Sequence, residues 1–246
     1  MPLRAAPADQ SEMISQLLFG DYFTILEKEN EWIKIALDFD NFEGYIDHKQ
    51  YVEISASEFL KLKESEHNYT AQVIDFTTNT KQDLCTIPLG AHLPYYNKNT
   101  FYLNNETYHF DGATLKGCLP KSEILQKAYI YLNSPFLWGG KTPFGIDCSG
   151  FTQMVYKLCG YKLLRNASAQ ATQGEVLSFI EESEPGDLAF FDNDEGEIIH
   201  VGIILNNYTI IHAHGKVRID TLDHSGIFNA DLQKHTHKLR VIKKII

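Results

Sequence analysis

The chain has 246 residues, of which 43% are hydrophobic and 12% are aromatic, enough to bury a substantial core. Its formal net charge is -10 at pH 7, with no cluster of Lys and Arg. Because nucleic acids and anionic membranes attract clustered positive charge, and no apolar run reaches the roughly 18 residues of a membrane span, we expect neither as a partner.

The first part of the chain has the pattern of a small β-barrel domain. Between residues 17 and 54, short β-rich segments alternate with turn signals at Glu29-Asn30 and Asp40-Asn41. The predicted strands are Tyr22 to Leu26, Trp32 to Leu37, and Tyr45 to Ile46. The length exceeds the usual size of one domain, so we assign residues 1–57 to a first domain of this kind.

A second β domain is predicted after a charged connection. Residues 58–66 are rich in Lys and Glu, which indicates a short helix or a linker, placed at 58–68. The β pattern then returns over 69–118, where residues 87–105 repeat the order of Gly, hydrophobic strand, Asn-containing turn and aromatic residue seen in 17–35. Two successive copies suggest a duplicated small barrel.

The remaining residues, 119–246, begin with a predicted helix. Ser122 is its expected N-cap, and the helix ends at Asn133, Ser134 and Pro135. Its apolar residues fall on one face, which predicts packing against a core. They are Ile124, Leu125, Ala128, Tyr129 and Leu132.

A second helix starts at Cys148, after a loop rich in glycine. Apolar residues follow Cys148 at helical spacing, Asp147 is the natural N-cap, and Gly160 is placed to end the helix. Unpaired N–H groups and the positive end of the helix dipole favour an anion in the first turn, and a cysteine can supply a thiolate there. This pattern favours Cys148 as a nucleophile over a buried structural thiol.

A partner for the thiolate is predicted in the segment 198–214, which is typical of two buried strands. If Leu205, Asn206 and Asn207 form a three-residue loop with Asn207 in the left-handed region, His200 lies directly opposite His212. A two-residue loop would point the two histidines to opposite faces. In the paired register His200 acts as the base and His212 orients it.

The other histidines are interpreted as structural or solvated, His237 among them. His212 and His214 together with Cys148 have the residue types of a zinc site, but no second Cys-x-x-Cys or carboxylate cluster accompanies them, so no metal and no cofactor is expected. Strands at Leu188–Phe191, Val217–Asp220 and Leu239–Ile246 are expected to extend the same antiparallel sheet. The fold class is therefore α+β, with helices on one side of the sheet.

Disulfides are not expected to stabilise the chain. Cys148 and Cys159 lie three helical turns apart and cannot bond to each other. For Cys85 and Cys118 a disulfide pair is one alternative, and two buried free thiols are the favoured interpretation. The first ten residues, MPLRAAPADQ, lack the apolar segment of a signal peptide. The cellular compartment is left open.

Several motifs in the second half resemble the NlpC/p60 family of papain-like bacterial cell-wall peptidases. They occur in the family's order, and together they are more specific than any one alone. They are PFLWGGKTPFGIDCSGF at 135–151, NASAQ at 166–170, PGDLAFF at 185–191, HVGIIL at 200–205 and IHA at 211–213. The resemblance implies a papain-like catalytic domain over 119–246, and the two preceding domains resemble the bacterial SH3-like domains that accompany such domains.

The resemblance implies cleavage of the γ-D-glutamyl to L-diamino acid bond in peptidoglycan stem peptides, by a monomeric enzyme without a cofactor. It assigns Cys148 as nucleophile, His200 as base and His212 as the third polar residue. In members that act on stem peptides with a free N-terminus, the residues flanking the cysteine, here Asp147 and Ser149, help to bind substrate. A role in muropeptide turnover or recycling would follow.

The terminal amine of L-alanine would be received by Asp147 with a Glu and a Tyr from the first SH3-like domain. Glu12 and Tyr45 are the candidates. One residue departs from the family pattern, because Phe136 stands where a Tyr is usual. Two alternatives stay open: a related amidase or acyltransferase using the same Cys-His pair, and a weakly active module that binds wall peptides.

Overall fold

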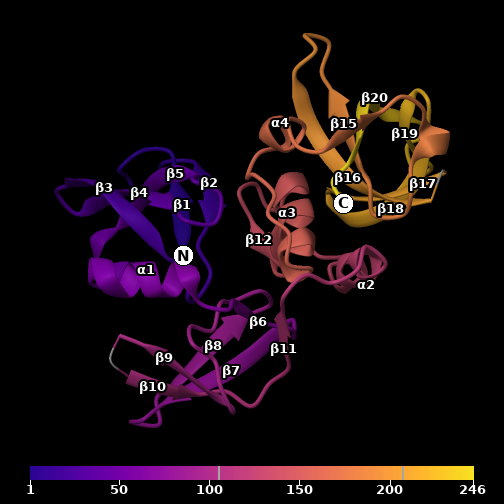
Figure 1. Cartoon of the computed structure of the whole chain (residues 1–246). Coiled ribbons are helices and arrows are strands. Elements are labelled where there is room, and N and C mark those ends of the chain that lie inside the picture. The colour runs from indigo at the N-terminus through magenta and orange to yellow at the C-terminus, as the bar shows by residue number, and fades with distance from the viewer. Residues whose placement is uncertain (105, 207) are drawn as a thin grey trace. The chain divides into compact units, whose positions relative to one another are not determined.

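The computed structural model describes residues 1–104, 106–206 and 208–246, and it separates into two compact units, Met1–Cys118 and Leu119–Ile246 (Figure 1). Each unit has its own buried core. Within the described residues, no helix combines the length and apolar character needed to cross a membrane. The units are described separately below.

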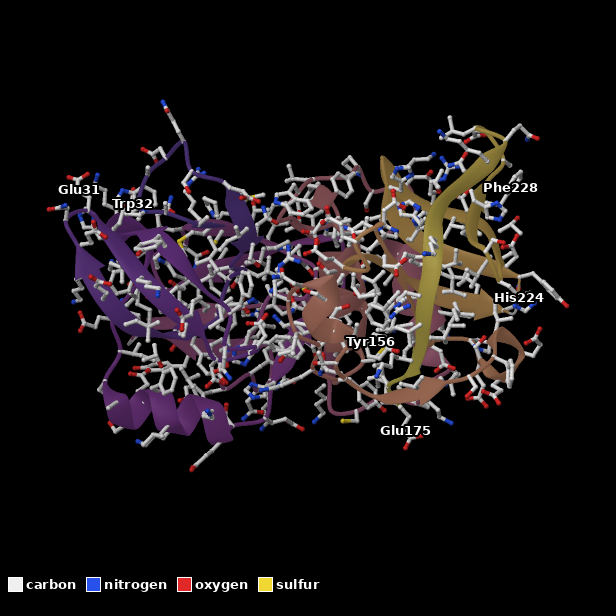
Figure 2. All side chains as sticks on the ribbon, turned by 90° about the horizontal axis from the view of Figure 1, so that it is seen from above. Glu31, Trp32, Tyr156, Glu175, His224 and Phe228 are labelled. Carbon is white, nitrogen blue, oxygen red and sulfur yellow. The ribbon has the colours of Figure 1, made fainter. Side chains whose placement is uncertain are left out.

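The first unit begins with a five-stranded antiparallel sheet in the order β2-β1-β5-β4-β3. The strands are β1 (Pro2–Arg4), β2 (Met13–Gln16), β3 (Phe23–Glu29), β4 (Trp32–Leu37) and β5 (Glu43–Asp47). The three predicted strands are confirmed, whereas β1 and β2 were missed. The predicted turns are confirmed by the positive φ of Asn30 (53°) and Asn41 (57°). Figure 2 labels Glu31 and Trp32 at the β3–β4 hairpin.

The charged connection is a helix. The short 3-10 helix η1 (His48–Gln50) is followed by α1 (Ala56–Glu64). The Ser55 side chain caps α1 by accepting a hydrogen bond from the Glu58 N–H, and Leu62 is the buried residue of this helix. Of the two predicted forms, helix and linker, the helix is correct.

The rest of the first unit is a second β region, with a four-stranded sheet β8-β7-β10-β9 and a separate pair β11-β6. The strands are β6 (Asn68–Thr70), β7 (Ile74–Asn79), β8 (Leu84–Pro88), β9 (Thr100–Leu103), β10 (Glu106–His109) and β11 (Thr114–Lys116). The proposed repeat fails in detail, because residues 93–99, aligned with β3, contain no strand, and residue 105 lies outside the described residues. Phe19 from the first β region packs into the core of the second.

The second unit carries three helices, α2 (Glu123–Ile130), α3 (Cys148–Leu158) and α4 (Ala167–Gln170). Ser122 precedes α2 as predicted, but its side chain makes no capping hydrogen bond because its backbone is already helical. Tyr129 is 48% exposed, so the predicted apolar face was too wide, and Tyr131 is buried instead. Tyr156 lies on α3 in the interior of this unit (Figure 2), and its hydroxyl donates to the Gly186 carbonyl at 2.6 Å.

A short hairpin of two strands precedes α3, and a seven-stranded antiparallel sheet follows α4. The hairpin strands are β12 (Lys141–Thr142) and β13 (Gly145–Ile146). The sheet contains β14 (Glu175–Leu177), β15 (Leu188–Asp192), β16 (Ile198–Asn206), β17 (Thr209–His214), β18 (Lys216–Asp223), β19 (Gly226–Asn229) and β20 (Lys234–Lys244), with the 3-10 helix η2 (Ile180–Glu182) between β14 and β15.

The sheet is closed rather than open, which corrects the expected arrangement. The long strand β20 pairs with β15 on one side and with β19 on the other, so β15 to β20 form a six-stranded barrel with β14 attached to β20 (Figure 1). Closure pairs the strand edges that an open sheet would expose. The core inside includes Phe191, Ile204, Ile210 and Ile227. The α+β class is as expected, and α3 packs on β16.

Candidate active site

Cys148 is the first residue of α3 and is buried, with 7% of its surface exposed. The Asp147 carboxylate caps the helix by accepting from the Gly150 N–H at 2.6 Å. The helix ends at Leu158, and Gly160 has a φ of 85°, the left-handed conformation that commonly follows a helix. The predicted start, cap and end of this helix are therefore confirmed.

The glycine-rich loop is held against the start of α3 by close backbone contact. A Cβ added at Gly150 would meet the carbonyl oxygen of Gly140, and one added at Gly140 would meet the carbonyl oxygen of Gly145. The Asp147 N–H also donates to the Gly140 carbonyl at 3.3 Å. These contacts fix the loop beside Cys148.

Asp147 is the centre of a buried ion pair. The Arg165 guanidinium, 2% exposed, donates from Nη1 to Oδ1 at 3.0 Å and from Nη2 to Oδ2 at 2.6 Å. The Gly139 N–H donates to Oδ2 at 2.9 Å, and the Ser149 hydroxyl lies 3.4 Å from Oδ1. With the capping bond from Gly150, five donors share a carboxylate that has about four lone-pair sites. Arg165, not singled out by the sequence analysis, thus anchors the residue before the cysteine.

The Asp147 oxygens carry structural bonds and Arg165 balances their charge, and the role of Asp147 as a receiver of a substrate ammonium stays a prediction. Ser149 Oγ likewise accepts from Arg165 at 3.0 Å. Glu12 is exposed and Tyr45 is half-buried, both in the first unit, so their role in substrate binding stays a prediction.

Gln170 of α4 also holds the start of α3. Its amide nitrogen donates to the Ser149 carbonyl at 3.0 Å, and its amide oxygen accepts from the Thr152 hydroxyl at 2.7 Å. Gln170 belongs to the NASAQ motif at 166–170, for which the sequence predicted no role. The site is therefore braced from the loop that follows α3.

The two histidines meet, although the predicted strand register was wrong. Gly202, not His200, lies opposite His212. Between Ile204 and Thr209, β16 carries one extra residue, Leu205, which makes a β-bulge. The bulge restores the side-chain alternation that a plain two-residue connection would invert, so His200 and His212 share a face as diagonal neighbours. The predicted left-handed Asn207 lies outside the described residues.

The imidazoles begin a chain of hydrogen bonds through the second unit. His200 Nε2 lies 2.8 Å from His212 Nδ1, and His212 Nε2 lies 3.0 Å from Asp220 Oδ2. Arg218 Nη2 donates to Asp220 Oδ1 at 2.9 Å. Because Asp220 accepts a proton from Nε2 of His212, Nδ1 of the same ring is left to accept from His200. The bond to His212 in turn leaves His200 Nδ1 free for another partner.

Burial keeps these imidazoles neutral. It lowers the pKa of His200 well below the usual 6.5, and the neighbouring His212 and His237 lower it further. Burial also lowers the pKa of His212, although the bond to Asp220 opposes the shift. Burial acts to raise the pKa of Asp220, but the bonds from His212 and Arg218 outweigh it and lower the value. A neutral histidine pair backed by a carboxylate is suited to accepting a proton.

Burial disfavours the thiolate of Cys148 and acts against the expected effect of the helix terminus. Burial raises the pKa of Cys148 to about 12, and the negative charge of Asp147 acts in the same direction. Hydrogen bonds from the backbone N–H groups of Val201 and Ser149 and the charge of Arg165 lower it, but by less. The Val201 bond ties the sulfur to the residue next to His200 on β16. Burial therefore outweighs the helix terminus, and deprotonation has to accompany the reaction.

A third imidazole, from β20, joins the pair. The His237 ring stacks on the His200 ring, with centroids 4.1 Å apart and planes 26° apart, and lies 5.6 Å from the His212 ring. We call His200, His212 and His237 the histidine cluster. His237 was expected to be structural or solvated. Closure of the barrel brings β20 alongside β15 and the histidine strands, and no local pattern in the sequence indicates this closure.

The four cysteines are free, as expected. Cys159 is buried and Cys85 is half-buried, but Cys118 is exposed, contrary to its predicted burial. Phe136, which replaces the usual Tyr, is 39% exposed, and its backbone N–H donates to the Gly215 carbonyl at 3.0 Å.

Comparisons with known proteins agree with this fold. Residues 133–239 match the profile of the NlpC/P60 family, and residues 3–50 match the profile described as the bacterial dipeptidyl-peptidase SH3 domain. A crystal structure of an NlpC/P60 family protein from Bacillus cereus superposes with a TM-score of 0.80, covering 95% of this chain and 82% of that one at 20% identity.

Two curated relatives align over most of the chain. A γ-D-glutamyl-L-lysine dipeptidyl-peptidase from Bacillus cereus is 24% identical over 230 residues, which cover 82% of this chain and 68% of the relative. Dipeptidyl-peptidase 6 from Lysinibacillus sphaericus is 25% identical over 248 residues, which cover 90% of this chain and 88% of the relative.

The matches define a chain with an N-terminal SH3-like domain and a mixed α/β NlpC/P60 domain. Residues 133–239 thus form an NlpC/P60 domain, and this domain together with relatives named dipeptidyl-peptidases supports a peptidase.

Proposed function

We propose that the chain is a cysteine peptidase that hydrolyses the γ-D-glutamyl to L-diamino acid bond of peptidoglycan stem peptides. The observation that carries the proposal is the hydrogen-bonded chain from Asp220 through His212 to His200, on a strand whose next N–H bonds to the Cys148 sulfur. A thiol bonded to the strand that carries a histidine base, with one nitrogen of that base not used by His212, suits nucleophilic catalysis.

In the reaction, Cys148 Sγ attacks the γ-carbonyl carbon while its proton moves to His200 Nδ1. His212 and the Asp220 carboxylate stabilise the imidazolium that forms. The Cys148 backbone N–H at the start of α3 stabilises the oxyanion. Phe136, in place of the usual Tyr, has no hydroxyl to add as a second donor. His200 then protonates the leaving amine of the diamino acid. Water next attacks the thioester carbon while His200 takes its proton, the acyl group leaves as a carboxylic acid, and His200 returns the proton to the Cys148 sulfur.

We also propose a preference for stem peptides with a free N-terminal L-alanine, which fits a role in muropeptide turnover or recycling. Support comes from the match of residues 3–50 to a dipeptidyl-peptidase SH3 profile and from relatives named dipeptidyl-peptidases. The ammonium would be received by Asp147, which Arg165 holds in place, together with Glu12 and Tyr45. A carboxylate and a phenol form charge-assisted bonds that a blocked amine cannot make.

The test is hydrolysis of L-Ala-γ-D-Glu-L-Lys and of the diaminopimelate analogue, each with a free and an N-acetylated terminus. The proposal expects release of L-Ala-γ-D-Glu from the free peptides, loss of release in Cys148→Ala and in His200→Ala, and little action on the acetylated ones. Transfer to an added amine without hydrolysis would indicate an acyltransferase, and binding without product would indicate a recognition module. Either result overturns the proposal.

The amine-binding assignment has its own test. Glu12→Gln and Tyr45→Phe are expected to reduce the preference for the free peptide over the acetylated one, with Glu27→Gln, an exposed carboxylate on β3, as the control. An unchanged preference in both variants would exclude these two residues from the role.

A further inference from the structure

The histidine cluster gathers three imidazoles from three strands at one point. One ring nitrogen of each of His200, His212 and His237 lies within 4.8 Å of the other two. His214 adds a fourth ring nearby, with its centroid 4.9 Å from that of His237. Catalysis as proposed uses only two of these rings, so the third needs an explanation.

The hydrogen bonds decide which nitrogens are available. His212 uses Nε2 for Asp220, which leaves Nδ1, and His237 uses Nδ1 for the Thr236 hydroxyl at 2.9 Å, which leaves Nε2. His200 Nε2 and His212 Nδ1 are 2.8 Å apart and therefore share one proton. A cation that replaces this proton would gain two nitrogen ligands at once.

Asp220 supplies the support that imidazole ligands usually have. Metal-binding histidines typically donate their second N–H to a carboxylate, which fixes the ring and makes the ligand nitrogen more basic. His212 has this arrangement with Asp220, and Arg218 holds Asp220 in place from the other side. The His212 ring is therefore already oriented to offer Nδ1.

We propose that the histidine cluster is a binding site for a Zn²⁺-class cation, held by one nitrogen from each of His200, His212 and His237. Tetrahedral zinc with N ligands needs nitrogens about 3.3 Å apart, so the His200–His212 pair has to widen by about 0.5 Å. Three imidazoles suit Zn²⁺, Cu²⁺ and Ni²⁺, whereas Mg²⁺ and Ca²⁺ prefer oxygen ligands.

The cation can reach these nitrogens from solvent. His200 and His212 are buried, but His237 is only half-buried, and the neighbouring His214 is exposed. His237 and His214 therefore lie on the solvent side of the cluster.

Occupancy has a consequence for activity, and this step rests on the function proposed above. A cation bound to His200 and His212 displaces their shared proton to solvent and prevents His200 from turning over as acid and base. Zn²⁺ is then a reversible inhibitor rather than a cofactor. His237 supplies the third nitrogen ligand, because two imidazoles alone give an incomplete ligand set.

The experiment is calorimetric titration of ZnCl₂ into the full-length, untagged chain after removal of metals with EDTA, with MgCl₂ as the comparison. We expect one Zn²⁺ per chain and no saturable Mg²⁺ binding. His237→Gln is expected to weaken Zn²⁺ binding at least tenfold, while His235→Gln retains it within twofold. His235 is a matched control because it lies on the same strand but is exposed and paired with Asp223.

Absence of saturable Zn²⁺ binding in the wild-type chain overturns the proposal, as does unchanged affinity in a folded His237→Gln variant. If that variant does not fold, histidine ring ¹⁵N spectra of the wild-type chain decide instead. Zn²⁺ must then shift three ring systems, and shifts confined to other histidines refute the site. A chain without peptidase activity would refute the proposed function, but the titration would still decide the cation site.

Discussion

Replacing Arg165 with leucine tests the buried ion pair that positions the cysteine. Arg165 is 2% exposed and donates two hydrogen bonds to Asp147 and one to Ser149. The substitution leaves the Asp147 carboxylate buried without its countercharge, a change that costs about 3 to 5 kcal/mol. It also removes a charge that lowers the pKa of Cys148, so that pKa rises further and hydrolysis slows.

The free energy of unfolding is measured by urea denaturation, with Trp138 fluorescence as the probe in a Trp32→Phe background. The chain contains two tryptophans, one in each unit, so this background reports on the second unit alone. Arg240→Gln is the matched control, because Arg240 lies 3.6 Å from Asp192 but is 63% exposed, and such pairs contribute about 0 to 1 kcal/mol.

Adding Asp147→Asn to Arg165→Leu is expected to recover part of the lost stability, because the uncompensated charge is removed. A loss below about 1 kcal/mol in Arg165→Leu, equal to that of the control, would refute the reasoning. The reasoning would also be refuted if the double variant Arg165→Leu with Asp147→Asn were no more stable than Arg165→Leu alone.

Three further predictions concern the thiol, the histidine cluster and the loop. Burial raises the pKa of Cys148 to about 12, so iodoacetamide should alkylate it more slowly than the exposed Cys118 at every pH from 6 to 9. The rate of Cys148 alkylation should increase with pH. Faster alkylation of Cys148 than of Cys118 at acidic pH would instead show a thiolate. The pKa values of the histidine cluster are lowered in the folded chain, so the unfolded chain binds protons first as the pH falls. In urea titrations with EDTA present, the free energy of unfolding should therefore fall below about pH 6.5, by up to roughly 1.4 kcal/mol per pH unit for each histidine. A flat profile from pH 6.5 to 4.5 would contradict this. Gly150→Ala should lower the melting temperature and the hydrolysis rate although alanine favours helices, because its Cβ would meet the Gly140 carbonyl, whereas stabilisation would show that the loop yields.

Local signals predicted the parts of the site that depend on neighbouring residues. The cap at Asp147 and the stop at Gly160 are set within a few residues of the helix, so the sequence identifies the position of Cys148 correctly. The turns at Asn30 and Asn41 were predictable for the same reason, because left-handed conformations favour asparagine.

The rest depends on contacts distant in the sequence. Leu205 bulges because of how β16 pairs, and a single extra residue changes which side chains face each other. Arg165 meets Asp147 across 18 positions, and a polar loop does not indicate which of its charges is buried. His237 approaches His200 only because β20 closes the barrel, and no periodicity in the sequence indicates closure.

The central claim is that the Cys148 sulfur forms the covalent bond to the substrate. The direct measurement is rapid acid quenching of the chain during turnover of L-Ala-γ-D-Glu-L-Lys, followed by peptide mapping by mass spectrometry. We expect an L-Ala-γ-D-Glu thioester on the peptide that contains Cys148. Turnover that continues in Cys148→Ala, or a steady state with the acyl group on another residue, would contradict it.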